Sequence, residues 1–153
     1  MPERHIRVNR RIPAPTGSVW AVFADFPNLA RHWKGLRSTT AMGEQTSGLG
    51  ARRRVGLKPI GSMDETVTVW QEGRRIDTEN QPSTLVPFSH AASSLTLEPD
   101  DDGTMANFAY RYRPRGGPIG RITGPLIDRM LTRTFNDMLV ALEEVALSNG
   151  QEI

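Results

Sequence analysis

The chain has 153 residues, a net charge of +2 and no cysteine. This length predicts one domain over residues 1–153, and the missing cysteines exclude disulfides and thiolate chemistry. The basic residues are scattered along the chain, so we expect no nucleic-acid partner. The N-terminal segment lacks the apolar run of a secretory signal, and no stretch reaches the roughly 20 apolar residues of a membrane span. We therefore expect a cytoplasmic protein without stable membrane insertion.

The N-terminal third predicts one strand followed by two short helices. Apolar and polar residues alternate over residues 4–12, which is typical of a half-buried strand. Thr16 or Ser18 is expected to cap a helix that ends before Pro27. A second short helix is predicted over 28–33. Helices of this length are marginal alone, so we expect them to pack against the end of a sheet.

Further strands are predicted from the enrichment in threonine, valine and tyrosine between turn signals. Glycine, aspartate and proline separate these segments at short intervals, which indicates antiparallel hairpins. The segments are 36–45, 50–57, 62–71, 74–81, 89–99 and 104–114. With the first strand they form a sheet of about seven strands.

The C-terminal segment changes to a helical period. Apolar residues recur at intervals of three and four from Ile127 to Val145, which predicts a helix of about 24 residues beginning at Pro125. The glycine-rich segment 116–124 is predicted to be a flexible joint. A sheet with one apolar face must bury that face, and the long helix is the element large enough to cover it. The fold class is therefore α+β.

Hairpin geometry predicts a row of polar side chains on the inner face of the sheet. A turn at 59–61 places Arg53 opposite Glu65, and a two-residue turn at 72–73 places Glu65 opposite Asn80. An arginine and a glutamate across a ladder can pair. The same counting pairs Val67 with Thr78 and Val69 with Ile76. A turn at 101–102 pairs Ser93 with Tyr110, Leu95 with Phe108 and Leu97 with Ala106. A register shifted by one residue would instead turn Thr66, Thr68 and Trp70 inward.

The order of elements resembles the START/Bet v 1-like (SRPBCC) superfamily, and most closely its bacterial polyketide cyclase/dehydrase-like branch. The resemblance rests on "APTGSVWAVFADFPNLARHW", "GLGARRRV", "EPDDDGTMANFAYRYRP" and "FNDMLVALEEVA". It implies the helix-grip fold, in which a curved antiparallel sheet wraps around the C-terminal helix. It also implies a cavity between sheet and helix that holds lipids, sterols, polyketides, hormones or quinones. Only some members are enzymes, and no catalytic signature is matched residue by residue.

The predicted site is an apolar cavity with a few polar groups that orient a ligand. Trp33 is interpreted either as a gate at the cavity mouth or as simple packing of the second helix. Arg53 and Glu65 are either a polar handle in the cavity or a structural pair. The side chains expected to contact a ligand are Trp33, Arg53, Glu65, Val67, Thr78, Asn80, Ser93, Leu95, Phe108, Tyr110, Met130 and Thr134.

The favoured function is the binding of a small hydrophobic or aromatic ligand, of lipid, polyketide or quinone type. The first alternative is a polyketide cyclase or aromatase, with Glu65 as a base and Tyr110 polarising an enolate. An intact Arg53–Glu65 pair would argue against that alternative. The second alternative is a protein-interaction domain with a dry interior and no cavity. No cofactor or metal is expected, because the three histidines fit no metal spacing. A monomer and a homodimer both remain open.

Overall fold

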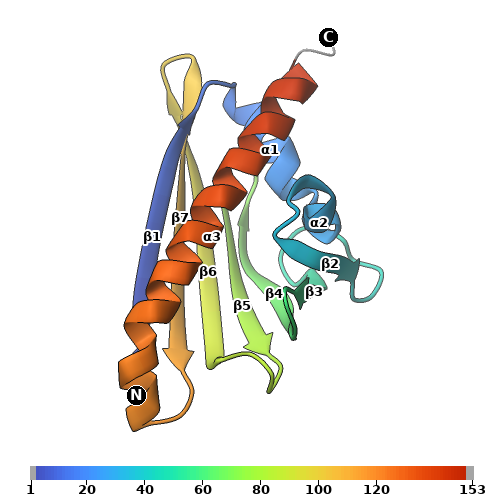
Figure 1. The fold of residues 1–153 in the computed structure, drawn as a ribbon. Coiled ribbons are helices and arrows are strands. Elements are labelled where there is room, and N and C mark those ends of the chain that lie inside the picture. The colour runs from blue at the N-terminus through green and yellow to red at the C-terminus, as the bar shows by residue number, and fades with distance from the viewer. Residues whose placement is uncertain (1–2, 151–153) are drawn as a thin grey trace.

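The computed structural model describes residues 3–150, and one curved antiparallel sheet forms its frame (Figure 1). The strand order is β1-β7-β6-β5-β4-β3-β2, so every neighbouring pair except β1–β7 is consecutive in the chain. The strands are β1 (Arg4–Ile12), β2 (Leu36–Ala41), β3 (Arg52–Leu57), β4 (Ser62–Gln71), β5 (Arg75–Pro82), β6 (Phe88–Asp100) and β7 (Gly103–Pro114). The predicted fold class is confirmed.

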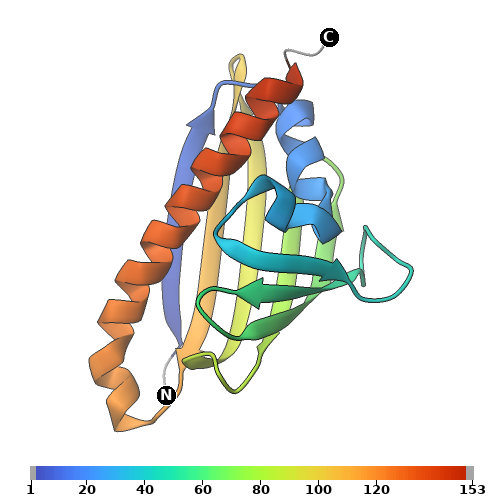
Figure 2. The same ribbon diagram turned by 45° about the vertical axis from the view of Figure 1, so that its right-hand side comes forward.

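The helices occupy the concave side of the sheet. Helix α3 (Pro118–Gly150) crosses that side obliquely, and α1 (Thr16–Ala24) lies beside its C-terminal half (Figure 2). A 3₁₀ turn, η1 (Phe26–Asn28), and the single-turn helix α2 (Leu29–His32) continue from α1 toward β2. The short helices therefore close one end of the sheet, as their length predicts.

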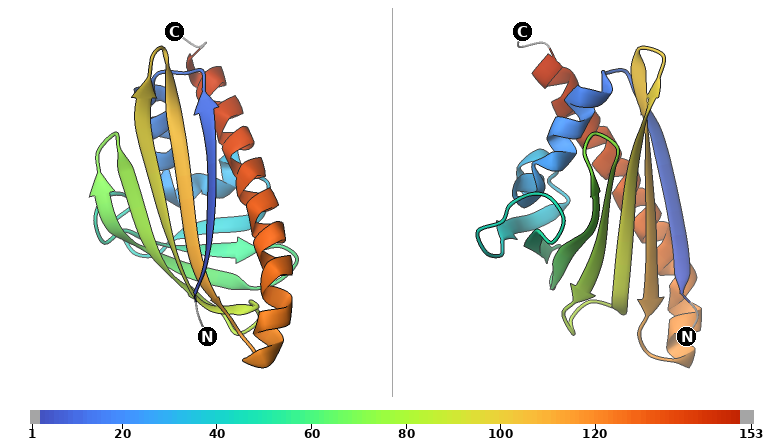
Figure 3. Two further views of the ribbon diagram at one scale, coloured as in Figure 1. Left: turned by 90° about the vertical axis from the view of Figure 1, so that its left-hand side faces the viewer. Right: turned by 180° about the vertical axis from the view of Figure 1, so that it is seen from behind.

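Helix α3 is anchored along the β1–β7 edge of the sheet rather than over its middle (Figure 3). Arg4 donates two hydrogen bonds to Asp128, and the buried Tyr112 hydroxyl donates to the same carboxylate. Farther along, Arg10 donates to Glu143 at 2.7 Å. These contacts hold one side of α3 to the β1–β7 edge, while η1 contacts β2 and β3 and α2 contacts β2 at the other end of the sheet.

Helix α3 begins seven residues before the predicted start at Pro125. The predicted flexible joint is therefore wrong for residues 118–124, which are helical. The turn into the helix is made by Gly116 and Gly117, both at positive φ, so glycine is needed there but not beyond it. Gly124 has a packing role instead, because a Cβ at this position would lie 2.9 Å from the Arg4 side chain.

The predicted helix caps are also wrong. Pro15 occupies the N-cap of α1, and no side chain caps this helix. The Thr16 hydroxyl instead lies 3.1 Å from the Thr104 hydroxyl of β7, because tertiary packing offers it a partner outside the helix. The second helix is shorter than predicted, since residues 26–28 form a 3₁₀ turn.

The predicted register of the inner row is confirmed, although one turn differs. Arg53 pairs with Glu65 and Glu65 with Asn80, while Val67 pairs with Thr78. The β4–β5 turn has three residues instead of two, with Gly73 at positive φ. A bulge between Val67 and Val69 absorbs the extra residue, as three-residue hairpin loops often require.

The bulge changes the pairs nearest to this turn. Val69 pairs with Asp77 and not with Ile76, and Ile76 pairs with Trp70. The prediction of Val69 opposite Ile76 is therefore wrong. Trp70 packs against the core and its ring lies 5.3 Å from that of Trp20. Beyond the bulge, the strand therefore follows the alternative register, in which Trp70 faces inward.

Candidate functional site

An elongated cavity of about 380 Å³ lies between the sheet, α3 and the short helices. It exists because α3 follows the sheet edge while β3 to β5 curve away from it. Its walls are mostly apolar. The side chains from the sheet are Val55, Leu57, Met63, Ile76, Leu95 and Phe108, and those from the helices are Phe23, Phe26, Leu29, Leu131, Phe135 and Met138.

The charged group inside the cavity is the cross-strand pair of Arg53 and Glu65. The Arg53 guanidinium lies 2.7 Å from Glu65 Oε1, and the two side chains are only 12% and 9% exposed. Arg53 also donates to the carbonyl of Phe26 at 2.8 Å. Its guanidinium carbon lies 3.9 Å from the centre of the Phe26 ring. The arginine charge is thus neutralised and covered, so the cavity has no unpaired cation at this point.

Neutral hydroxyls line the floor of the cavity. Thr78 and Ser93 hydrogen-bond to each other at 2.6 Å, and Tyr110 donates to the sulfur of Met63 at 3.6 Å. Burial raises the pKa of Tyr110, and the nearby negative charge of Glu65 raises it further. Tyr110 is therefore a protonated phenol near neutral pH. Its sulfur partner is a weak acceptor, and the Asn80 side chain beside the hydroxyl acts in the opposite direction and lowers the pKa.

Trp33 forms part of the wall next to the short helices. It follows α2 in extended conformation and is buried. Its indole ring lies over Gly35, where any Cβ would overlap the ring. The absence of a side chain at Gly35 therefore allows Trp33 to fold back into the cavity wall. Both interpretations of Trp33 are compatible with this position, since it packs and also lines the cavity.

The structure brings most of the sequence-predicted site residues to one place. The predicted residues that line the cavity are Trp33, Arg53, Glu65, Thr78, Ser93, Leu95, Phe108, Tyr110, Met130 and Thr134. Val67 and Asn80 also face inward, but they are buried in the core and do not belong to the cavity wall. A residue that faces the concave side of the sheet therefore does not always line the cavity, because neighbouring side chains can cover it. Whether any of these residues contacts a ligand remains a prediction.

Asn80 is nevertheless unusual. It is 2% exposed, and neither its amide nitrogen nor its amide oxygen has a hydrogen-bond partner within residues 3–150. A buried amide without partners costs free energy, so this position is the least satisfied polar group near the cavity floor.

Sequence reasoning missed the loops that border the cavity. The β3–β4 loop contributes residues 58–60 and the β5–β6 loop contributes residues 85–87. Both contain exposed large apolar residues, Ile60 and Leu85. The available signal was an isoleucine in the predicted turn at 59–61 and a leucine between the predicted strands 74–81 and 89–99, because connecting segments are usually polar.

The sequence matches a protein family described as "Polyketide cyclase / dehydrase and lipid transport" over residues 3–146. The chain belongs to this family. No curated protein is significantly similar to the chain. The match and the fold together place it in the Bet v 1-like SRPBCC superfamily.

Several solved structures share this fold over almost the whole length of the chain. The crystal structure of TTHA0849 from Thermus thermophilus is 19% identical with a TM-score of 0.79, over 95% of this chain and 99% of that one. The crystal structure of Ara h 8.0201 is 12% identical with a TM-score of 0.75, over 96% and 99%. A protein of Nitrosospira multiformis is 16% identical with a TM-score of 0.74, over 97% and 100%. At these identities the likeness concerns the fold.

Two features are absent from the part of the chain that the structure describes. Within residues 3–150, no three acidic, histidine or cysteine side chains are grouped as metal ligands would be. No helix in this range combines the length and the apolar character that crossing a membrane requires.

Proposed function

We propose that the chain binds a small hydrophobic or aromatic ligand, of lipid, polyketide or quinone type, in the cavity between the sheet and α3. The observation that carries the proposal is a cavity of about 380 Å³ whose walls are mostly apolar. This volume lies in the range of small-molecule pockets. Burial of apolar ligand surface would supply most of the affinity, at about 25 cal/mol per Å² before the costs of association.

The polar groups favour a ligand whose polar end is uncharged. Arg53 is already paired with Glu65, so a ligand carboxylate beside it would gain no free cation and would lie near a carboxylate. The other cation of the lining, Lys58, is exposed on the β3–β4 loop. Hydroxyls of Thr78, Ser93 and Tyr110 are neutral donors and acceptors that suit a ligand carbonyl or hydroxyl.

The enzymatic alternative has less support. A cyclase mechanism needs Glu65 free to accept a proton, but Arg53 donates to it at 2.7 Å. Tyr110 would have to donate a hydrogen bond to an enolate, and burial, which raises its pKa, makes the phenol a weaker acid for that task. The alternative of a dry interaction domain fits poorly with a cavity of this size.

The test begins with native mass spectrometry of the protein purified from its own cells, followed by extraction under denaturing conditions. A hydrophobic molecule released from the complex would support the proposal and identify its class. In parallel, titration with the neutral fluorescent probe phenylnaphthylamine measures access to the cavity.

A pair of variants locates the binding. Thr134 lines the cavity, whereas Thr132 lies two residues away on α3 and does not line it. Thr134→Trp should fill the cavity and weaken probe binding at least tenfold, while Thr132→Trp should bind like the wild type. Equal binding by both variants, or no binding by the wild type, would contradict the proposal.

A further inference from the structure

The exposed large apolar side chains gather at one end of the molecule. Among the described residues, all but Leu49 and Val140 lie on the N-terminal half of α3 or on the two loops beside it. We call this group the mouth surface, and it consists of Ile60, Leu85, Ile119, Ile122, Leu126 and Met130. Isolated exposed apolar residues are ordinary, but a contiguous patch indicates an interaction site.

Four members of the mouth surface form one stripe on α3. Ile119, Ile122, Leu126 and Met130 follow one another at intervals of three, four and four, which places them on one helix face. At 1.5 Å per residue the stripe is about 16 Å long. A second apolar stripe, which includes Ile127 and Leu131, is buried against the core. This half of α3 therefore has one apolar face for the core and another exposed to solvent.

The exposed stripe has basic neighbours. Arg129 and Arg133 are exposed on the side of α3 that carries the stripe. Asp128 lies on the other side of the helix, together with Arg121 seven residues before it, and Arg4 holds it there at 2.6 Å. The surface around the stripe is therefore apolar and positively charged, which is the pattern of helices that lie at a membrane interface.

The mouth surface is continuous with the opening of the cavity. Ile60, Leu85 and Met130 are exposed and also line the cavity, together with the exposed Lys58. Met130 comes from the N-terminal half of α3, whereas Ile60 and Leu85 come from the β3–β4 and β5–β6 loops. A planar surface that covers the stripe would thus cover the cavity entrance as well.

We propose that the mouth surface docks on an anionic phospholipid bilayer. The isoleucines, Leu126 and Met130 enter the headgroup region, while Arg129 and Arg133 contact lipid phosphates. The charge decides between occupants, because a second copy of the chain would bring the same cations against these arginines. The docking surface does not depend on the proposed ligand, so vesicle binding is measured without one.

The experiment is sedimentation of the full chain with vesicles of phosphatidylcholine alone or with added phosphatidylglycerol. We expect binding to the anionic vesicles that weakens as salt is raised. The Ile122→Ser/Leu126→Ser variant should bind at least tenfold more weakly. The Arg129→Gln/Arg133→Gln variant should lose about tenfold toward anionic vesicles and remain unchanged toward phosphatidylcholine.

Matched controls distinguish vesicle binding by the mouth surface from nonspecific hydrophobic or electrostatic binding elsewhere on the protein. Leu49 is 67% exposed and Leu126 is 68% exposed, so Leu49→Ser removes an equally exposed leucine from the β2–β3 loop, away from the mouth surface. Arg7→Gln/Arg52→Gln removes two exposed charges from the convex face of the sheet. Both controls should bind vesicles like the wild type.

A spectroscopic readout tests contact with the bilayer directly. Because the chain has no cysteine, Leu126→Cys and Leu49→Cys can each carry one environment-sensitive fluorophore. The label at residue 126 should shift to the blue on adding anionic vesicles, and the label at residue 49 should not. The proposal is overturned if the wild type ignores anionic vesicles or if the controls lose as much binding. It is also overturned if the stripe variants change only self-association or the capture of an acidic protein. Probe binding in the cavity reports separately on the proposed function.

Discussion

Two arginine–carboxylate pairs lie next to each other on strands β3 and β4, but on opposite faces of the sheet. Arg53 and Glu65 face the cavity, with side chains 12% and 9% exposed. Arg54 and Asp64 face solvent, with side chains 59% and 29% exposed. Both pairs have a shortest contact of 2.7 Å. The two pairs occupy neighbouring positions of the same ladder at the same distance, and their largest difference is burial. Arg53 also contacts Phe26, whereas Arg54 binds both oxygens of Asp64.

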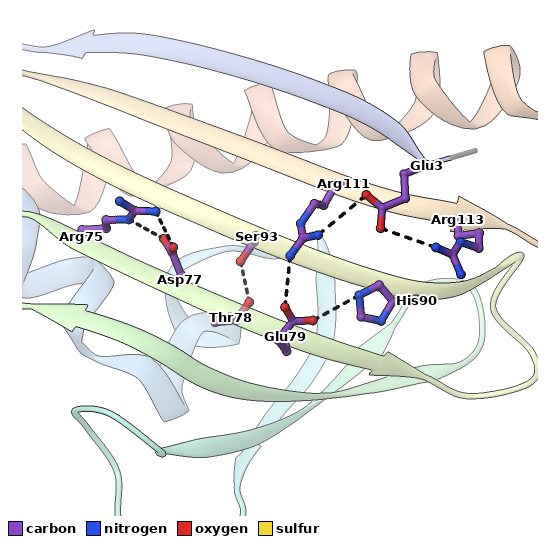
Figure 4. A network of polar contacts seen from close by, with 9 residues as sticks. All are labelled: Glu3, Arg75, Asp77, Thr78, Glu79, His90, Ser93, Arg111 and Arg113. Carbon is purple, nitrogen blue, oxygen red and sulfur yellow. Dashed lines mark hydrogen bonds and ion pairs between the residues drawn. The ribbon is translucent and has the colours of Figure 1, made fainter. Parts of the chain in front are cut away.

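The outer pair belongs to a surface rich in such contacts. On the same convex face, Arg111 contacts both Glu3 and Glu79, and Glu79 also lies 3.2 Å from His90 (Figure 4). These ions keep most of their hydration, so each pair contributes little. The inner pair has lost its hydration, and each ion depends on its partner. The same kind of cross-strand pair therefore contributes little to stability on the convex face and is required for stability on the inner face.

The largest expected effect comes from breaking the inner pair. Glu65→Leu leaves Arg53 as an unpaired buried cation, which should lower the free energy of unfolding by about 3–5 kcal/mol. The outer counterpart, Asp64→Leu, should hardly move the unfolding midpoint. Urea denaturation of the two variants measures the contrast, and equal losses would remove the distinction between the faces.

A double variant distinguishes loss of the pair from loss of packing. Arg53→Met/Glu65→Leu replaces both ions by apolar side chains and should recover most of the stability lost in Glu65→Leu. If the double variant is as unstable as the single one, the packing of these side chains and not their charge stabilises this part of the cavity wall.

The next effect concerns glycines inside and outside the cavity wall. Gly35→Ala forces a methyl group into the Trp33 indole, so we expect a loss of about 1–3 kcal/mol and altered tryptophan fluorescence. Gly17→Ala meets nothing within 4 Å in helix α1 and should stabilise the protein by up to about 1 kcal/mol. Thermal unfolding of both variants tests the opposite signs.

A smaller contrast separates two inward-facing tyrosines of β7. Tyr112 donates to the Asp128 carboxylate under α3, whereas Tyr110 donates to the Met63 sulfur in the cavity. Tyr112→Phe should cost about 1–2 kcal/mol, because Asp128 is partly exposed and loses one donor. Tyr110→Phe should cost less than about 1 kcal/mol, because a sulfur acceptor is weak. Urea denaturation that ranks them in the reverse order would contradict the assignment of Tyr112 as the helix anchor.

The smallest effect is a titration of the outer pair. The hydrogen bond from Arg54 holds the pKa of Asp64 below its usual value, against partial burial, which raises it. A lowered folded-state pKa means that the stabilisation is present above about pH 4 and is lost as the pH falls through the folded pKa. Carboxyl NMR titration should show a pKa below about 3.9 for Asp64, and Arg54→Gln should raise it. An unchanged pKa in that variant would show that the pair does not persist in solution.

The register of the inner row could be predicted from the sequence because strands have a strict period of two. Arg53, Glu65 and Asn80 therefore share a face once the β3–β4 turn is located. The predicted β4–β5 turn is one residue too short, and the bulge after Val67 compensates for the difference farther along the ladder. The length of a turn depends on the balance between favourable turn geometry and regular strand pairing, and the residues of the turn alone do not determine that balance.

The cavity residues were only partly predictable. Glu65 and Asn80 are neighbours in the same row, yet Glu65 lines the cavity and Asn80 lies in the core. The exposed stripe from Ile119 to Met130 was not predicted, because helical periodicity alone indicates the buried face and gives no reason for a second apolar face. Residues 116–124 suggest a joint because glycines lower helix propensity, whereas Gly124 serves close packing against Arg4.

The sequence by itself determined which side chains face inward and which outward, because alternation along strands and helical periodicity are local properties. It also indicated that the long helix packs on the concave side of the sheet, since no other element presents as much apolar surface. Only the tertiary structure decided where the helix stops touching the sheet, and therefore where a cavity opens. That outcome depends on the curvature of the sheet and on the anchoring of α3 at the β1–β7 edge, which are set by many weak contacts between residues far apart in the chain.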